Sequence, residues 1–255
     1  FIASPSNATQ RYLYRTSLTK PGKPTLLTPA SAPGTHSYQL SPNAAYAIHT
    51  FSSFANPSTI DIIQLPGNTS VRVLQDNKQL RDKVNALQRG EASFFKVKTS
   101  EYVELDGWRM LPPNFDSTKR YPVLIHVYGE PAGQTVIDRW GGTGYLWHLM
   151  LTQQGYIVMS LDNRGTPAPR GRAWRKSIYR QIGILASRDQ AKALQQLEHQ
   201  WSFIDTTRIG VWGWSGGGSM TLNLLFRYPD LYQTGMSVAP VPDQQLYDAT
   251  YQERY

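Results

Sequence analysis

The chain of 255 residues contains no cysteine. No disulfide can therefore crosslink the fold, and a thiol cannot act as a nucleophile. No apolar run approaches the roughly 20 residues that a membrane-spanning helix requires. With 40% apolar and 12% aromatic residues, the chain can nevertheless bury a hydrophobic core, so its composition excludes a disordered protein.

Basic residues are in excess but do not cluster. The net charge is +8, and no run of Lys and Arg forms the stripe that binds phosphate backbones. The sequence therefore predicts a solvated basic surface and no nucleic-acid partner. It also lacks a His, Asp and Glu cluster at metal-ligand spacing and a glycine-rich loop that would cradle phosphates, so we expect no metal and no other cofactor.

Residues 1–90 contain short alternating segments separated by turn signals such as Pro21-Gly22 and Pro42-Asn43. Similar residues recur at a spacing of 47: Leu18 and Leu65, Leu26 and Val73, Leu27 and Leu74. Repeats of 40 to 50 residues with four strands each are typical of β-propeller blades. The pattern fits the tail of a propeller (all-β) and a generic piece of antiparallel sheet about equally well.

Residues 91–255 have a different pattern. A helix at 77–87, near the end of the first part, is expected to connect it to the second. The second part is expected to open with a hairpin whose turn is at Asp106-Gly107. From residue 120 onward, apolar strand-like runs alternate with helical patterns, which predicts α/β structure with a mostly parallel sheet. The segment from Ser187 to Gln190 has the form of a capping box, which predicts that a helix begins at Ser187.

The segment Gly213-Trp214-Ser215-Gly216-Gly217 carries the chemistry. A strand-like run precedes it and a helix-like run follows, which is the context of a nucleophile elbow that exposes a serine hydroxyl. The sequence predicts Ser215 as the nucleophile and the N–H of Gly216 as a donor to the oxyanion of the reaction. The alternative is a glycine-rich turn without chemistry.

A second oxyanion donor is expected from the loop after an earlier strand. Tyr128 lies there, and a phenol is a competent donor, although Tyr128 is equally well read as a core aromatic. Asp162 is expected to have a structural role in its loop, and His126 and His148 are expected to lie in the core. In α/β-hydrolases the acid and the base follow the serine, yet the last histidine is His199.

These motifs, together with Val127 to Pro131, Asp162 to Gly165 and Tyr247 to Tyr255, resemble the dipeptidyl peptidase IV branch of the prolyl oligopeptidase family. The resemblance implies that residues 1–90 are the C-terminal part of a β-propeller with its connector. It implies that residues 91–255 are the first part of an α/β-hydrolase peptidase domain. The chain begins at Phe1 rather than Met, and we expect a fragment or processed product that lacks the triad Asp and His.

The resemblance also implies a serine exopeptidase that releases X-Pro or X-Ala dipeptides from peptides with a free N-terminus. Ser215 would be the nucleophile, Tyr128 and Gly216 the oxyanion donors, and Val241, Tyr247 and Tyr251 the lining of the pocket. The family often has Tyr where this chain has Gly216, and Trp where it has Gln244. A homodimer and a periplasmic or secreted location are further implications, and the fragment alone is expected to be inactive. The alternatives are a related acylaminoacyl or tripeptidyl peptidase or esterase, and a catalytically silent binding protein.

Overall fold

Contacts divide the chain into two units in the computed structural model, which describes residues 1–255. The first unit contains Phe1–Gln88 and Ile137–Leu146, and the second contains Arg89–Val136 and Trp147–Tyr255. Residues 137–146 therefore group with the N-terminal strands, although they lie within the α/β part of the sequence. No helix of the structure combines the length and the apolar character that crossing a bilayer requires.

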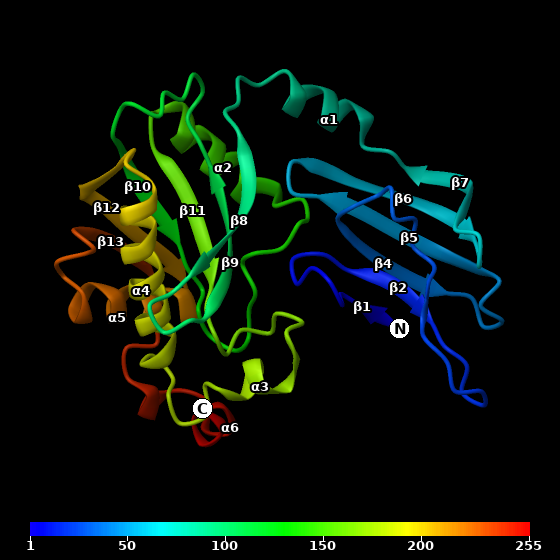
Figure 1. Ribbon diagram of the computed structural model, residues 1–255. Helices are drawn as coiled ribbons and strands as arrows, with labels where there is room; N and C mark the ends of the chain where they lie inside the picture. The colour runs from blue at the N-terminus through cyan, green and yellow to red at the C-terminus, as the bar shows by residue number, and fades with distance from the viewer. The chain divides into compact units, whose positions relative to one another are not determined.

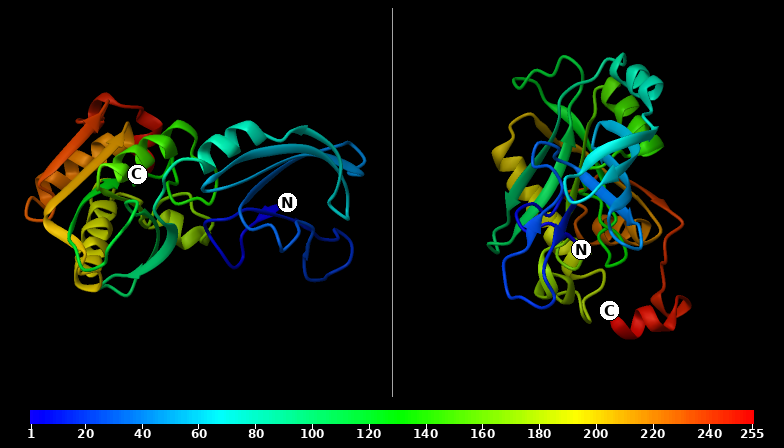
Figure 2. Two further views of the ribbon diagram at one scale, coloured as in Figure 1. Left: turned by 90° about the horizontal axis from the view of Figure 1, so that it is seen from above. Right: turned by 90° about the vertical axis from the view of Figure 1, so that its right-hand side faces the viewer.

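The first unit is built from two antiparallel sheets (Figures 1 and 2). One contains three strands and the other four, and each is ordered as its strands occur in the chain. The strands of the smaller sheet are β1 (Ile2–Ala3), β2 (Tyr12–Arg15) and β3 (Thr25–Leu26). Those of the larger sheet are β4 (Thr35–Leu40), β5 (Tyr46–Ser53), β6 (Asn56–Gln64) and β7 (Thr69–Gln75), and helix α1 (Lys78–Asn85) follows.

The 47-residue repeat of the sequence is also a repeat of strand pairing. Tyr14 of β2 pairs with Leu26 of β3, and 47 residues later Asp61 of β6 pairs with Val73 of β7. The next pairs correspond as well, because Arg15 faces Thr25 and Ile62 faces Arg72. The internal similarity thus marks one hairpin that is built twice with the same register.

A chain of polar contacts crosses β4, β5 and β6. His36 donates from Nε2 to the carbonyl oxygen of Ala32 at 2.8 Å, and burial lowers the pKa of His36 to about 4, so this ring is neutral. Its Nδ1 is then an acceptor, and His49 Nε2 at 2.9 Å must be the donor. His49 Nδ1 lies 2.9 Å from Asp61 Oδ1 and donates too. His49 thus links His36 to the carboxylate of Asp61.

Replacing Asp61 with Asn should destabilise the first unit, because it removes the carboxylate that accepts from His49 Nδ1. We expect the free energy of unfolding to fall by about 2 kcal/mol, the typical value of a hydrogen bond to a charged group. Denaturant unfolding measures this, and Asp82→Asn is the control, since Asp82 pairs with Lys78 on the surface. Equal effects of the two substitutions would contradict this role of Asp61.

The second unit contains a six-stranded mixed sheet in the order β13-β12-β10-β11-β9-β8. Four neighbouring strands are parallel, and the hairpin β8–β9 adds to β11 in the antiparallel sense. The sheet is thus only partly parallel. The strands are β8 (Ala92–Lys98), β9 (Glu104–Met110), β10 (Tyr121–His126), β11 (Ile157–Asp162), β12 (Ile204–Trp214) and β13 (Thr234–Val238).

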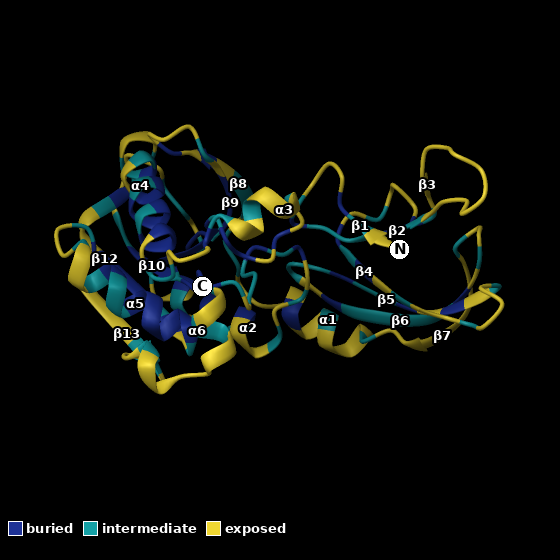
Figure 3. Cartoon of the chain, turned by 90° about the horizontal axis from the view of Figure 1, so that it is seen from below, coloured by how far each residue is buried: buried dark blue, intermediate teal, exposed yellow.

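Helices cover both faces of the mixed sheet. Helices α4 (Leu185–Gln200) and α5 (Gly216–Arg227) pack on one face and α2 (Gly142–Gln153) on the other, whereas α3 (Gly171–Lys176) and α6 (Ala249–Arg254) are short helices in connecting segments. Alternate strand residues such as Ile125 and Met159 form a core with Leu194 of α4 and Leu224 of α5, and Figure 3 shows that buried residues are concentrated in these two helices. The alternation follows from the two-residue period of a strand.

Aromatic and histidine rings fill the opposite face of the sheet. His126 stacks on Trp212 at 4.6 Å between ring centroids, and His148 of α2 lies 5.3 Å from both His126 and Trp108. Burial lowers the pKa of His126 to about 4 and that of His148 to about 3, so both rings are neutral. His148 is buried as predicted, and His126 is partly buried in the same aromatic layer.

Two local predictions are wrong. Asp106-Gly107 does not turn but lies within β9, paired on both sides, and the hairpin reverses at Thr99–Val103, where the N–H of Thr99 donates to the carbonyl of Val103. Helix α4 begins at Leu185 rather than at Ser187, whose hydroxyl donates to the carbonyl of Gly183 in the preceding turn. Gln190 faces inward and donates to the carbonyl of Leu161.

Candidate active site

Ser215 lies at a sharp turn between β12 and α5. Its backbone has φ 56° and ψ −120°, a conformation that costs a non-glycine residue about 1–3 kcal/mol. The N–H of Ser215 donates to the carbonyl of Val238 at 2.9 Å, and its carbonyl accepts from the N–H of Ser219 at 3.0 Å. The hydroxyl has no hydrogen-bond partner within the chain. The turn therefore presents a half-buried serine whose hydroxyl makes no hydrogen bond within the chain.

The glycines around Ser215 are required by close backbone approach. A Cβ atom at Gly213 or at Gly217 would lie 2.3 Å from the carbonyl oxygen of Val127, and one at Gly218 would lie 2.6 Å from that of Val238. Neither carbonyl oxygen can move away without displacing the end of its strand. The spacing of glycines in the motif thus reflects the packing of the turn against β10 and β13.

Tyr128 follows β10 directly and lies beside the same turn. Its Cα is 3.3 Å from the position of a Cβ at Gly217, and Gly133 leaves room for its ring. Tyr128 is half-buried and outside the hydrophobic core, and its hydroxyl has no partner within the chain. Burial, with Glu130 and Tyr247 nearby, raises the pKa of Tyr128, so the phenol keeps its proton and can donate.

The loop after β11 supports the turn that carries Tyr128. Gly129 has φ +75°, and its carbonyl accepts from Asn163 Nδ2 at 2.9 Å. Asn163 Oδ1 in turn accepts from Gln190 Nε2 of α4 at 3.0 Å. The sequence placed Asn163 in a motif and Gln190 in a capping box, but gave no signal that their amides support this turn.

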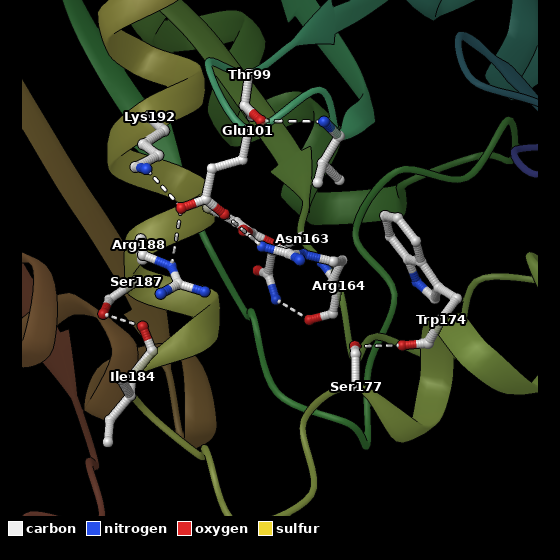
Figure 4. Close-up of polar contacts among 12 residues, drawn as sticks. Thr99, Glu101, Asn163, Arg164, Trp174, Ser177, Ile184, Ser187, Arg188 and Lys192 are labelled. Atoms are coloured by element: carbon white, nitrogen blue, oxygen red, sulfur yellow. Dashed lines mark hydrogen bonds and ion pairs between the residues drawn. The ribbon is translucent and has the colours of Figure 1, made fainter.

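Charged groups fix the outer side of the same loop (Figure 4). Arg164 donates to the buried carboxylate of Asp189 at 2.6 Å, and a second contact joins it to Glu101 at 3.1 Å. Lys192 and Arg188 of α4 converge on Glu101 as well. The network connects the loop to α4 and to the turn of the β8–β9 hairpin.

Asp162 has the structural role that was predicted. Its carboxylate accepts from the N–H and the hydroxyl of Thr135 at 3.0 and 3.1 Å, and from the N–H of Val136 at 3.2 Å. Complete burial raises the pKa of Asp162 to about 6 despite these bonds. Its oxygens are committed to the loop rather than directed at Ser215.

Val241, Tyr247 and Tyr251 lie on the segment after β13. Val241 is attached to α5, since its N–H donates to Ser219 Oγ at 2.9 Å and its carbonyl accepts from the same hydroxyl at 3.1 Å. The rings of Tyr247 and Tyr251 meet edge to face with centroids 5.5 Å apart. Tyr251 also donates to Glu130 Oε2 at 2.6 Å, a partner that the sequence analysis did not identify.

None of the five histidines is bonded to Ser215. His36 and His49 lie in the first unit, His126 and His148 in the aromatic layer, and His199 is exposed at the end of α4. No three His, Cys, Asp or Glu side chains lie where they could hold a metal ion. The arrangement thus offers a candidate nucleophile and two candidate oxyanion donors without a base in contact.

Two models of protein families match this chain. Residues 145–255 match the model of the prolyl oligopeptidase family, and residues 1–58 match that of the dipeptidyl peptidase IV N-terminal region. The chain belongs to the dipeptidyl peptidase IV branch of the prolyl oligopeptidase family. The predicted membership is confirmed, and the elbow at Ser215 and the segment of Tyr247 and Tyr251 both fall within the first match.

Individual relatives match along the chain. A probable dipeptidyl-aminopeptidase B of Emericella nidulans is 36% identical over 265 residues, which is 100% of this chain and 28% of the relative. Dipeptidyl peptidase 4 of Trichophyton equinum is 34% identical over 72% of the chain and 24% of the relative. The crystal structure of Porphyromonas gingivalis dipeptidyl peptidase 4 superposes with a TM-score of 0.91 at 36% identity, covering 100% of this chain and 35% of that one. The chain thus spans about a third or less of the length of these relatives.

Proposed function

We propose that the whole protein is a serine exopeptidase that releases X-Pro or X-Ala dipeptides from the free N-terminus of peptides. The observation that carries the proposal is the strained Ser215 turn, whose hydroxyl and neighbouring donors are free of partners within the chain. The names of the relatives, dipeptidyl peptidases and aminopeptidases, support the same reaction. In this proposal residues 1–90 belong to a β-propeller and residues 91–255 to an α/β-hydrolase domain.

The reaction proceeds in two steps through an acyl-enzyme. Ser215 Oγ attacks the carbonyl carbon of the second substrate residue while a base takes its proton, and the remaining peptide leaves as an amine. The negative charge on the carbonyl oxygen is stabilised by the N–H of Gly216, which has no acceptor within the chain, and by the Tyr128 hydroxyl. Water then hydrolyses the ester and frees the dipeptide.

Other parts of the whole protein complete the site. Since no histidine of the chain contacts Ser215, we assign the base and its acid to other residues of the protein, and we expect the 255 residues alone to show no turnover. Acidic residues elsewhere would bind the substrate amine, and the whole protein would form a homodimer. Val241, Tyr247 and Tyr251 form the pocket, where rigid aromatic rings can bury a proline ring at small entropic cost.

The choice of substrate distinguishes the candidate reactions. We expect the whole protein to hydrolyse Gly-Pro anilide with a kcat/KM at least about 100-fold above that for acetyl-Gly-Pro anilide. The reason is that a free amine anchors the dipeptide, and acetylation removes this charged contact. A factor of this size is on the order of the loss of one charged contact. Faster cleavage of the acetylated substrate would favour an acylaminoacyl peptidase. Turnover restricted to simple esters would favour an esterase, and no turnover at all would favour a silent binding protein.

A further inference from the structure

Glu130 is a buried acid in the candidate active site without a basic partner. Only 8% of the residue is exposed, and no Lys, Arg or His forms an ion pair with it. The one hydrogen bond of its carboxyl group comes from Tyr251, whose hydroxyl lies 2.6 Å from Oε2. Burial raises the pKa of Glu130, and the bond from the phenol opposes that effect. The contact joins the turn after β10 to α6 over 121 residues of sequence.

Gly216 leaves the space that the carboxyl group of Glu130 fills. A Cβ atom at this position would lie 2.4 Å from Oε2 and 2.7 Å from Cδ of Glu130. Gly216 lies in the first turn of α5 and does not need a positive φ, so a preference for glycine there comes from the space that the Glu130 carboxyl group occupies. A side chain on the residue after Ser215 would displace the carboxyl group and break its bond to Tyr251.

The same carboxyl group lies close to the other candidate site residues. Its charge contributes to raising the pKa of Tyr128 and that of Tyr251. Tyr251 in turn contacts Tyr247 edge to face, and Asp248 fixes the start of α6 by accepting from the N–H of Tyr251 at 2.8 Å. Tyr251 is therefore fixed at its backbone N–H by Asp248 and at its hydroxyl by Glu130.

We propose that Glu130 is a specificity-determining residue: its carboxyl group takes the place of a side chain at position 216 and fixes the Tyr251 phenol as a wall of the substrate pocket. The proposal rests on the proposed function and names the class of substrate that this wall selects. With the wall fixed, the pocket admits a small or cyclic second residue, Pro or Ala. Without it, Tyr251 can move and the pocket admits larger residues such as Leu.

The test compares kcat/KM of the whole protein for Gly-Pro anilide and Gly-Leu anilide. Glu130→Ala should lower the preference for Gly-Pro about tenfold, the usual size of discrimination by shape in an apolar pocket, and it should do so mainly through KM. Tyr251→Phe should have the same effect. Tyr255→Phe is the matched control, because the Tyr255 hydroxyl has no partner within the chain, and Glu130→Gln should retain the preference, since its amide oxygen can still accept.

A second set of variants tests whether the Glu130 carboxyl group and a side chain at position 216 compete for the same space. Gly216→Ala should reduce the preference as Glu130→Ala does, and the double variant should be no worse than either, because the new methyl group then has room. Additive losses, or an unchanged preference in Glu130→Ala, would overturn the proposal. The thermal unfolding midpoint should stay close to that of the wild type in every variant, which separates a change in the pocket from a damaged fold. A wild-type protein that cleaves neither anilide would contradict the proposed function itself.

Discussion

Replacing Ser215 with alanine in the whole protein is expected to lower kcat for Gly-Pro anilide about a millionfold. Losses of this size follow removal of a catalytic serine, since no other group can form the acyl-enzyme. The unfolding midpoint should change little, because alanine makes the same backbone hydrogen bonds to Val238 and Ser219 and adopts the same strained turn. Initial-rate kinetics and thermal unfolding measure the two effects.

The control for this substitution is Ser202→Ala. Ser202 is exposed in the loop after α4, so its loss should leave both the rate and the stability unchanged. If Ser215→Ala retained more than about a hundredth of the wild-type rate, a nucleophile other than Ser215 would be required. If it lost activity together with its folded structure, the loss would not report on chemistry, and Ser215→Cys would then be assayed for a residual thiol-dependent rate.

Replacing Tyr128 with phenylalanine should lower kcat by about 10²–10³ with little change in KM, the usual effect of removing one oxyanion donor. The phenol has no partner within the chain, so its removal leaves no buried group unsatisfied. Burial raises its pKa, which keeps the hydroxyl a donor at the pH of the assay. Steady-state kinetics on Gly-Pro anilide gives kcat and KM separately.

Tyr156→Phe is the matched control, since Tyr156 is 38% exposed before β11 and its hydroxyl also lacks a partner. An equal loss in both variants would show that Tyr128 acts through the fold. A rise in KM at constant kcat would instead assign Tyr128 to substrate binding in the ground state.

The features that the sequence predicted correctly have local causes. The Ser215 elbow requires glycines at fixed offsets, because the turn passes within van der Waals contact of β10 and β13, and this need is visible in the motif itself. The 47-residue spacing of the sequence recurs in the pairing of β2–β3 and β6–β7, although the sequence predicted no register. Such patterns can be read without knowing the tertiary structure.

The features that could not be predicted depend on distant contacts. Asp106-Gly107 is a favourable turn pair, yet pairing with β8 and β11 holds it in an extended strand, and Gly107 is needed there because a Cβ would lie 2.5 Å from the ring of Phe95. Glu130 could not be assigned either, because its partner Tyr251 is 121 residues away. The surroundings of Gly216 could not be predicted either, because the carboxyl group that fills the space of its Cβ comes from Glu130.

The most direct test of the account is labelling of the whole protein with a fluorophosphonate, followed by mass spectrometry of its peptides. A reactive serine at the elbow predicts a single adduct on Ser215, formed within minutes and blocked by a Gly-Pro substrate analogue. An unlabelled Ser215, or an adduct that forms on other residues and ignores the analogue, would contradict the assignment of Ser215 as the nucleophile.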